Sequence, residues 1–277
     1  MTDKYALFGK PVSQSRSPFI HSCFAAQFNQ VIDYQAILIA ADSDFLADVQ
    51  AFARAGGQGA NVTAPYKEMA YQICRQLSPA AALAGAVNTL LFLSDGSISG
   101  DNTDGIGLVR DLERITSLNG KRVLLIGAGG AARGCILPLL ESGINALTLT
   151  NRTLHKARHL CELFAAHVPA EVSLTSHALA ELANDYDIII NSTSAGLGGE
   201  LPALDARVVK GSLCYDMVYG AGLTLFNQWA FTAGAKQVHD GLGMLVGQAA
   251  VSFQLWRKQT PDIEPVLTQL RLQLEQA

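Results

Sequence analysis

The chain has 277 residues, of which 49% are hydrophobic and 16% are charged, and its formal net charge is −4. This length suits two hydrophobic cores, because domains most often hold about 100–150 residues. An acidic chain without a basic cluster disfavours nucleic acid and anionic membranes as partners, so small molecules become the expected ligands.

The start of the chain and its cysteines favour a cytoplasmic protein. The apolar run after Lys4 is broken by Gly9 and Lys10, which matches neither a signal peptide nor a membrane span. The five cysteines are odd in number, lack C-x-x-C spacing and lie mostly among apolar residues. We therefore expect reduced thiols in a core.

Short β-like runs alternate with helical periodicity in the first part of the chain, which is typical of an α/β fold. The predicted elements are strands at Tyr5–Phe8, Tyr34–Ile39 and Gly59–Thr63, and helices at Ser17–Phe28 and Asp42–Ala55. Two further β-like runs, "AVNTLLFL" and "SISGDN", flank Ser94-Asp95-Gly96, whose Asp-Gly pair suits a tight turn. An antiparallel hairpin is therefore expected to close this half.

A domain boundary is expected near residue 103. The run "TDGIGLVRDLERI" predicts a helix with Thr103 or Asp104 as a cap, and "KRVLLIG" predicts the strand that follows it. Apolar residues between 242 and 256 follow helical steps, and a last helix begins near Pro265. The expected domains are 1–103 with 241–277, and 104–240, with the ligand site between them.

The segment "VLLIGAGGAARG" carries a dinucleotide-binding motif. It places Gly127, Gly129 and Ala132 in G-x-G-x-x-A spacing between an apolar strand and a helical run. The first glycine permits a tight turn, the second lets the backbone approach a pyrophosphate, and the alanine permits close helix packing. The helix N-terminus supplies N–H groups for the anion. A glycine turn without a ligand is the alternative, and the strand–turn–helix context disfavours it.

The end of the next strand, "ALTLTNRT", indicates which dinucleotide binds. NAD-binding proteins usually carry an acid about 20 residues beyond the glycines, whereas this chain has Asn151 and Arg152. A guanidinium can pair with the 2′-phosphate of NADP, and Thr153 and Lys156 are further candidate contacts. NADP is therefore favoured over NAD, with a solvated arginine as the alternative.

Three polar segments stand just before helices, where each also has an ordinary explanation. "SQSRSP" offers Ser15 and Ser17, and "GDNTDG" offers Asp104, but serine and aspartate are common helix caps. "GANVTAPYKE" places Lys67 at the start of a helix, where the helix dipole disfavours a cation by a few tenths of a kcal/mol. A solvated surface lysine is the alternative to a functional one.

No metal site is predicted. His155 and His159 lie four residues apart on a predicted helix, but no third ligand is suggested, so a solvated helix face is favoured. Asp216, in "YDMVYG", is expected to cap or brace the end of a strand.

Eight motifs in one order, spread over residues 9–248, identify the chain as similar to the shikimate dehydrogenases. They are "GKPVSQSRSP", "GANVTAPYKE", "AGAVNTL", "GDNTDG", "GAGGAARG", "NRT", "YDMVY" and "DGLGMLVGQ". The resemblance implies an N-terminal α/β substrate domain, a doubly wound Rossmann-type NADP-binding domain, and C-terminal helices that return to the substrate domain. It also implies the reversible reduction of 3-dehydroshikimate by NADPH to shikimate, a step of aromatic amino acid biosynthesis.

The same resemblance implies roles for individual residues. Lys67 matches the catalytic acid/base, with Asp104 as its orienting partner, while Ser15, Ser17 and Tyr219 match residues that hold the substrate carboxylate. The matches around the ring hydroxyls are Thr63, Asn88, Asp104 and Gln248. The matches to the NADP site are Gly127, Ala128, Gly129, Gly130, Ala131, Asn151, Arg152, Thr153 and Lys156, with Met217 and Gly241 near the nicotinamide.

Two positions differ from the family pattern, and two other functions remain open. Gln14 stands where a histidine is common and Pro79 where some members carry an acid, so both are expected to affect affinity more than chemistry. A quinate/shikimate dehydrogenase with relaxed cofactor use is one alternative, which Arg152 disfavours. A non-catalytic sensor of the same ligands is the other, which Lys67 and Asp104 disfavour. Both a monomer and a homodimer remain possible.

Overall fold

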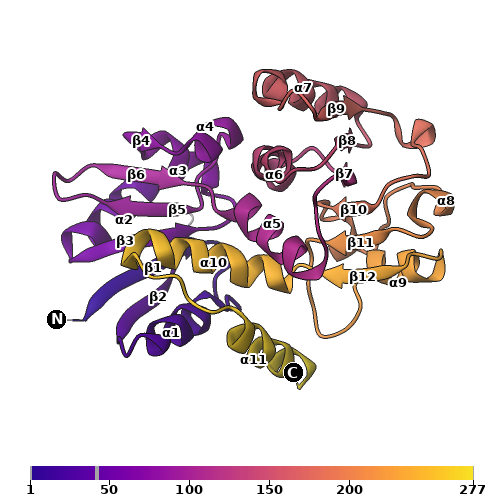
Figure 1. The fold of residues 1–277 in the computed structure, drawn as a ribbon. Helices are drawn as coiled ribbons and strands as arrows, with labels where there is room; N and C mark the ends of the chain where they lie inside the picture. Colours follow the sequence, from indigo (N-terminus) through magenta and orange to yellow (C-terminus); the bar gives the residue numbers. More distant parts are fainter. Residues whose placement is uncertain (1, 41–43, 277) are drawn as a thin grey trace. The chain divides into compact units, whose positions relative to one another are not determined.

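The computed structural model describes residues 2–40 and 44–276 and divides into two compact units (Figure 1). The first unit contains the residues up to Gly107 together with Val246–Val266. The second contains Leu108–Leu245 and the segment from Leu267 onward.

Three helices contribute to both units. Helices α5 (Asp104–Ile115), α10 (Leu242–Arg257) and α11 (Glu264–Glu275) each contain one of the division points, so the units divide inside helices and not before them. The sequence analysis placed 267–277 with the first domain, whereas this segment groups with the second unit.

Within the described residues, the first unit has a six-stranded sheet in the order β2-β1-β3-β5-β6-β4. Its strands are β1 (Asp3–Gly9), β2 (Ile32–Leu38), β3 (Gly57–Val62), β4 (Gln76–Leu77), β5 (Thr89–Phe92) and β6 (Ile98–Asp101). Strand β1 pairs in parallel with β2 and β3, whereas β5 runs antiparallel to both β3 and β6. The sheet is therefore mixed.

Helices cover this sheet and bury its apolar side chains. They are α1 (Ser17–Gln27), α2 (Phe45–Arg54), α3 (Lys67–Ile73) and α4 (Pro79–Ala84). Phe45 and Val49 of α2 pack with Phe8, Val62 and Leu90 of the strands, and all five are at most 2% exposed. The predicted helix start at Asp42 lies outside the described residues, and the described helix begins after the cap Asp44.

The predicted hairpin is confirmed, and its register sets up the site described below. Gly96 has φ +81°, which favours glycine, and the Ser97 N–H donates to Asp95 Oδ1 at 2.9 Å. Strands β5 and β6 pair with Thr89 opposite Asp101. Asn88, just before β5, is therefore brought to the residues that follow β6.

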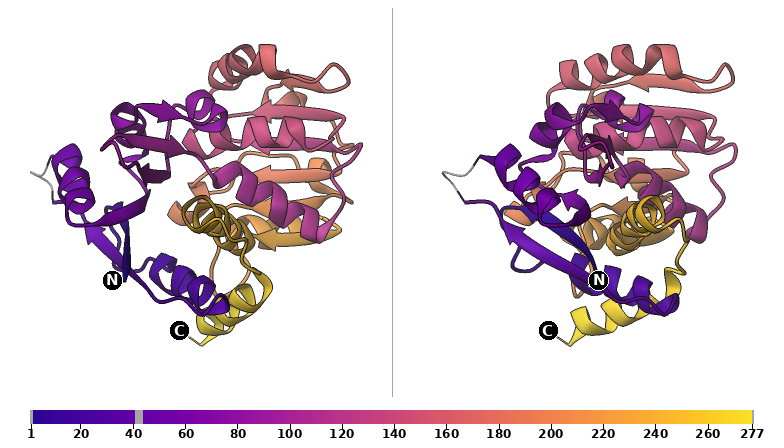
Figure 2. Two further views of the ribbon diagram at one scale, coloured as in Figure 1. Left: turned by 60° about the vertical axis from the view of Figure 1, so that its left-hand side comes forward. Right: turned by 90° about the vertical axis from the view of Figure 1, so that its left-hand side faces the viewer.

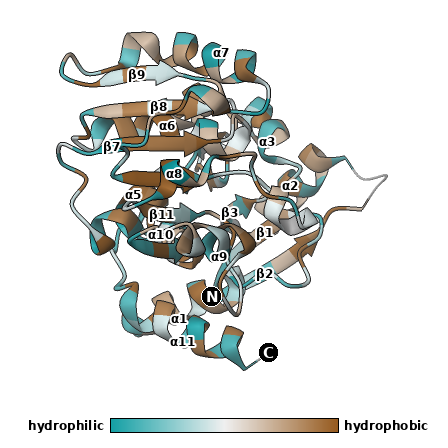
Figure 3. Cartoon of the chain, turned by 90° about the vertical axis from the view of Figure 1, so that its right-hand side faces the viewer, coloured by the Kyte–Doolittle hydropathy of each residue, from teal (hydrophilic) through white to brown (hydrophobic). Residues whose placement is uncertain are grey.

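Within the described residues, the second unit has a six-stranded parallel sheet in the order β12-β11-β10-β7-β8-β9. Its strands are β7 (Arg122–Ile126), β8 (Ala146–Thr150), β9 (Ser173–Ser176), β10 (Ile188–Asn191), β11 (Leu213–Asp216) and β12 (Gln237–Asp240). The order reverses between β7 and β10, as in a Rossmann-type fold. Strands β7 and β8 are largely hydrophobic (Figure 3), as expected for strands buried on both faces.

The helices of the second unit can be followed from two further directions in Figure 2. They are α6 (Gly130–Glu141), α7 (Leu154–Phe164), α8 (Ala206–Val209), α9 (Leu225–Thr232) and α11 (Glu264–Glu275, from Leu267 onward), with 3-10 turns η1 (Ala165–His167), η2 (Leu179–Glu181) and η3 (Ala195–Gly198). None of the five cysteines, all of which lie in the described residues, forms a disulfide bond. Across the described ranges, every helix is too short or too polar to cross a membrane.

Candidate active site

Lys67 is paired with an acid and is not a freely solvated lysine. It is the first residue of α3, and its carbonyl accepts from the Val87 N–H at 2.9 Å, which ties the start of the helix to the segment before β5. Its Nζ donates to Asp104 Oδ2 at 2.5 Å, and the two side chains are 30% and 15% exposed. The carboxylate offsets the unfavourable position of a cation at the positive end of a helix.

Asp104 is the first residue of α5, but its side chain is turned to other partners than the helix backbone. The Asp104 N–H donates to Asn102 Oδ1 at 3.2 Å, so Asn102 is the side chain that caps this helix start. The Asp104 carboxylate accepts from Lys67 and, at 2.8 Å, from Asn88 Nδ2. The sequence suggested Thr103 or Asp104 as the cap of this helix, but the Asp104 side chain binds Lys67 and Asn88 instead. Its negative charge still suits the helix N-terminus.

Asn88 holds this pair in place and has only one possible amide orientation. Its Oδ1 accepts from the Thr103 backbone N–H and from Thr89 Oγ1, both at 2.9 Å. A backbone N–H can only donate, so the amide oxygen must face Thr103 and Nδ2 must face Asp104. Asn88 is 3% exposed, and a buried amide with this many partners keeps its position.

Gln248 joins this group from α10. Its Oε1 accepts from Asn88 Nδ2 at 3.4 Å and from Thr103 Oγ1 at 3.3 Å. Ser252, one turn further along α10, donates to the Gln248 carbonyl at 3.1 Å. Four side chains named by the sequence analysis, Lys67, Asn88, Asp104 and Gln248, are thus connected by hydrogen bonds within the first unit.

Sequence reasoning missed the polar layer under this group. Asn61, on β3, is 4% exposed; its Oδ1 accepts from Tyr34 OH at 2.8 Å and its Nδ2 donates to Ser252 Oγ at 3.0 Å and Thr89 Oγ1 at 3.2 Å. Burial raises the pKa of Tyr34, so its phenol stays a donor. The available signal was the polar residues inside two apolar runs, one in "GANV" and two in "VNTLL".

Ser15, Ser17 and Thr63 lie in the same unit and make separate contacts. Ser15 Oγ accepts from the Ser17 N–H at 3.2 Å, but Arg16 is the N-cap of α1 and this helix start has no side-chain cap, so the capping explanation of the serines is wrong. Ser17 is 7% exposed. Thr63 lies close to Gly9: a Cβ added to Gly9 would be 2.3 Å from the Thr63 methyl, so the glycine leaves room for this threonine.

A fully buried histidine lies one helical turn after Ser17. His21 stacks on Tyr34 with ring centroids 4.5 Å apart, and among the described residues neither ring nitrogen has a hydrogen-bond partner. Burial lowers the pKa of His21 to about 3, and the nearby Asn61 only partly opposes this shift. The imidazole is therefore neutral at ordinary pH.

In the second unit, the glycine turn follows β7 at the point where the strand order reverses. Gly127 has φ +115°, and a Cβ there would lie 2.3 Å from Ser192 Oγ, so a larger residue does not fit. Ser192, just after β10, donates to the Ile126 carbonyl at 2.7 Å. The turn is thus held against the neighbouring strand.

The residues after Gly127 leave space for an anion. A Cβ on Gly129 or Gly130 would meet no atom within 4 Å, and α6 begins at Gly130. Ala131 is exposed and Ala128 is half-buried. An open approach to the first N–H groups of a helix is what a pyrophosphate needs, so these residues fit NADP.

The end of β8 also fits NADP. Asn151 Nδ2 donates to the Thr153 carbonyl at 3.0 Å, which folds the segment back on itself at the start of α7. Arg152 and Lys156 are exposed there. A strand end with two solvent-facing cations suits a 2′-phosphate.

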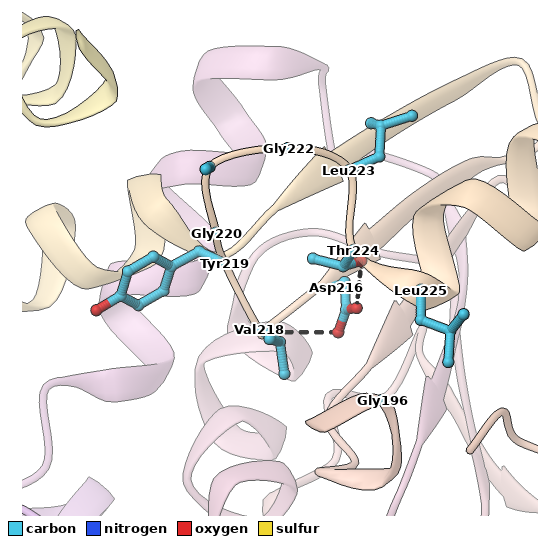
Figure 4. Close-up of a pocket in the computed structure, with 10 residues that line it drawn as sticks. Gly196, Asp216, Val218, Tyr219, Gly220, Gly222, Leu223, Thr224 and Leu225 are labelled. Atoms are coloured by element: carbon cyan, nitrogen blue, oxygen red, sulfur yellow. Dashed lines mark hydrogen bonds between the residues drawn. The ribbon is translucent and has the colours of Figure 1, made fainter. Parts of the chain in front are cut away.

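Met217 and Gly241 lie side by side after β11 and β12. A Cβ on Gly241 would be 2.1 Å from the Met217 carbonyl oxygen, and the Gly241 N–H donates to the Val218 carbonyl at 3.1 Å. Tyr219 follows on the same loop and points away from Asp216 (Figure 4). Among the described residues, no group of three His, Cys, Asp or Glu side chains could hold a metal ion.

Comparisons with known proteins agree with these motifs. Three family models match: the shikimate dehydrogenase substrate binding domain over residues 7–90, shikimate/quinate 5-dehydrogenase over 111–198, and the shikimate 5′-dehydrogenase C-terminal domain over 241–271. A shikimate dehydrogenase (NADP(+)) from Shewanella halifaxensis is 53% identical over 276 residues, which cover 99% of this chain and 97% of that protein.

Solved structures give the same result. An Ael1 enzyme from Pseudomonas putida is 41% identical with a TM-score of 0.91, and the match covers 97% of this chain and 98% of that one. Shikimate 5-dehydrogenase from Thermus thermophilus, solved with NADP(H) and shikimate, is 30% identical with a TM-score of 0.85, covering 98% and 99%.

Proposed function

Because the chain belongs to the shikimate dehydrogenase family, we propose that it catalyses the reversible, NADP-dependent reduction of 3-dehydroshikimate to shikimate. The observation that carries the proposal is the group formed by Lys67, Asp104 and Asn88, with a 2.5 Å bond between ammonium and carboxylate. A protein that only sensed these ligands would need no such proton donor.

Lys67 is the proposed general acid and base. In the reduction, its ammonium donates a proton to the carbonyl oxygen of the substrate as the carbonyl becomes a hydroxyl, and in the oxidation the neutral amine takes the hydroxyl proton back. Asp104 orients Nζ and balances its charge, while Asn88 Nδ2 holds Asp104 in place. NADP, when bound, accepts or supplies the hydride.

Substrate recognition is proposed to use hydroxyls and amides. Ser15, Ser17 and Tyr219 bind the carboxylate. The residues proposed to contact the ring hydroxyls are Thr63, Asn88, Asp104 and Gln248. Because such a site leaves polar groups unpaired when a substrate hydroxyl is missing, it discriminates strongly against deoxygenated analogues.

Cofactor binding is proposed to use the glycine turn and the end of β8. The turn Gly127–Ala131 would hold the pyrophosphate through the N–H groups at the start of α6, since the Gly127 N–H itself donates to the Thr150 carbonyl at 2.8 Å. Arg152 and Lys156, with Asn151 and Thr153, would hold the 2′-phosphate. Met217 and Gly241 lie near the nicotinamide. The proposed substrate domain is residues 1–103 and 241–277 and the proposed NADP domain is 104–240, with the difference that residues from Leu267 onward group with the second unit. We also propose a cytoplasmic monomer or homodimer, a location that the five cysteines without a disulfide bond support.

The test is a four-way assay with purified protein. Shikimate or quinate is mixed with NADP or NAD, and the appearance of reduced nicotinamide is followed. We expect the shikimate and NADP pair to give the highest kcat/KM. Comparable rates with quinate or NAD would favour a quinate/shikimate dehydrogenase with relaxed cofactor use. If the ligands bind but none of the four mixtures yields reduced nicotinamide, a sensor would be favoured.

A further inference from the structure

The loop Met217–Thr224, called the Tyr219 loop below, has little packing of its own. Gly220, Ala221 and Gly222 follow Tyr219, and Leu223 is 52% exposed. A hollow of about 260 Å³ lies along the loop and is lined by loop residues together with Gly196, Asp216 and Leu225. A glycine-rich segment beside a hollow does not hold one conformation by apolar contacts, so polar contacts must do so.

Asp216 holds both ends of this loop. Its Oδ2 accepts from Thr224 Oγ1 at 2.6 Å and its Oδ1 accepts from the Val218 N–H at 3.2 Å (Figure 4). Oδ1 also accepts from Asn191 Nδ2 at 3.1 Å. The residue is 1% exposed. Burial, together with the nearby charge of Asp240, raises the pKa of Asp216, and these hydrogen bonds only partly oppose the rise. Asp216 therefore braces the strand end, as the sequence analysis expected.

Arg271 holds the middle of the loop from α11. Its Nη1 donates to the Gly220 carbonyl at 3.1 Å. The same guanidinium makes a two-point contact with Asp240, with Nη1 to Oδ2 at 2.9 Å and Nη2 to Oδ1 at 2.6 Å. Asp240 is 10% exposed at its side chain and ends β12 in register with Asp216 on β11. A forked contact of this kind leaves the guanidinium little freedom, so the Gly220 carbonyl meets a fixed donor.

We propose that Arg271 and Asp216 are positioning residues that fix the Tyr219 loop, and through it the tyrosine hydroxyl that binds the substrate carboxylate. The inference rests on the proposed function, because the role of Tyr219 is part of it. Under this proposal, helix α11 contributes to substrate binding through Arg271, a role that no motif of the sequence suggested. Gly220 is the neighbour of Tyr219, so displacement of its carbonyl moves the tyrosine directly.

The main test compares Arg271→Met with wild type. Loss of the guanidinium should raise KM for shikimate by about three- to thirtyfold, the range for one hydrogen bond, while kcat and KM for NADP stay within about twofold. Arg207→Met, which removes an exposed arginine paired only locally with Asp205 on α8, is the matched control and should change none of these values. Thr224→Val should act in the same direction as Arg271→Met, and Thr224→Ser should restore wild-type KM.

A double-mutant cycle identifies the route of the effect. In a Tyr219→Phe background, Arg271→Met should raise KM for shikimate no further, because the hydroxyl that it positions is already gone. An undiminished effect of Arg271→Met in that background would overturn the proposal. So would a lower Tm of Arg271→Met with unchanged KM, since that is the outcome for a purely structural arginine.

A measurement made without substrate tests the positioning role of Arg271 independently of the proposed enzymatic function. Amide hydrogen exchange of residues 217–223 should be faster in Arg271→Met than in wild type and unchanged in Arg207→Met. If wild type lacks shikimate turnover, the proposed function fails while loop exchange still decides the role of Arg271. If wild type is active and Tyr219→Phe raises KM, but neither KM nor loop exchange responds to Arg271→Met, only the positioning role is wrong.

Discussion

The group around Lys67 and the glycine turn after β7 differ in how many of their polar groups already have partners within the protein. Asp104 is the partner of both Lys67 and Asn88, and Asn88 is further held by Thr89 and Thr103. Gly129 and Gly130 face open space instead. The first region is organised in advance, whereas the second is a surface that a ligand completes.

This difference matches the chemistry expected of each region. Proton transfer depends on the distance and direction between two groups, so a preformed hydrogen-bonded acid lowers the cost of reaching the reactive geometry. Anion binding at a helix N-terminus needs unpaired donors and access, so the region must stay open until the phosphates arrive. Substitutions in the two regions should therefore affect different kinetic constants.

The largest effect is expected at Lys67. Lys67→Met keeps most of the side-chain stem and removes the ammonium, so kcat should fall by about 10²–10⁴-fold, the usual contribution of general acid–base catalysis. NADPH affinity, measured by nicotinamide fluorescence titration, should barely change. A large loss of NADP binding would show that the two regions are not independent.

The stability of the region around Lys67 should fall at acid pH because of the buried His21. The pKa of His21 is lowered to about 3 in the folded protein, whereas in the unfolded chain the imidazole takes up a proton near the ordinary histidine pKa of 6.5. Stability is thus unaffected above pH 6.5 and falls by up to about 1.4 kcal/mol per pH unit as the pH drops from there toward 3.

Urea unfolding between pH 4.5 and 7.5 measures this loss. Trp256 reports on the region, since its ring centroid lies 5.2 Å from that of His21. His21→Phe should flatten the pH dependence relative to wild type, and His159→Gln, at an exposed helix position, should leave it unchanged. Equal pH slopes in wild type and His21→Phe would contradict a neutral, buried imidazole.

The open region is tested at Arg152. Arg152→Ala should weaken NADP binding by roughly 1.5–3 kcal/mol, the value of one charged hydrogen-bonded contact, and affect NAD far less. Arg158→Ala, at another exposed position of the same segment, is the control. Equal losses for NADP and NAD would mean that Arg152 does not recognise the 2′-phosphate.

The smallest effects are expected at the serines. Ser17→Ala should cost about 0.5–3 kcal/mol of shikimate binding and raise KM more than it lowers kcat. Ser15→Ala should do the same and also weaken the start of α1, because Ser15 accepts from the Ser17 N–H. Ser13→Ala is the exposed control. If the double variant at 15 and 17 keeps its shikimate affinity, the carboxylate binds elsewhere.

Local patterns predicted much of this molecule. The Asp-Gly turn between β5 and β6 and the strand–glycine–helix unit at β7 and α6 both follow from short-range chemistry, and both are present. The motifs containing Lys67 and Asp104 suggested convergence, and the side chains meet. The roles of these residues remain predictions.

Long-range partners escaped prediction for a physical reason. The contacts among Asn61, Thr89 and Ser252 depend on the register of β3 against β5 and on the packing of α10 against these strands. The sequence of a single segment does not determine this register. The pair of Arg271 and Asp240 is likewise long-range, so periodicity alone could not assign α11 to the second unit.

The central claim is that Lys67 and Asp104 act as one catalytic unit, and a double-mutant cycle in kcat tests it most directly. Lys67→Met, Asp104→Asn and the double variant are compared with wild type under saturating shikimate and NADP. Residues that act as a unit are non-additive, so the double variant should lose much less than the product of the two single losses. A double loss equal to that product, or near wild-type turnover in Lys67→Met, would contradict the claim.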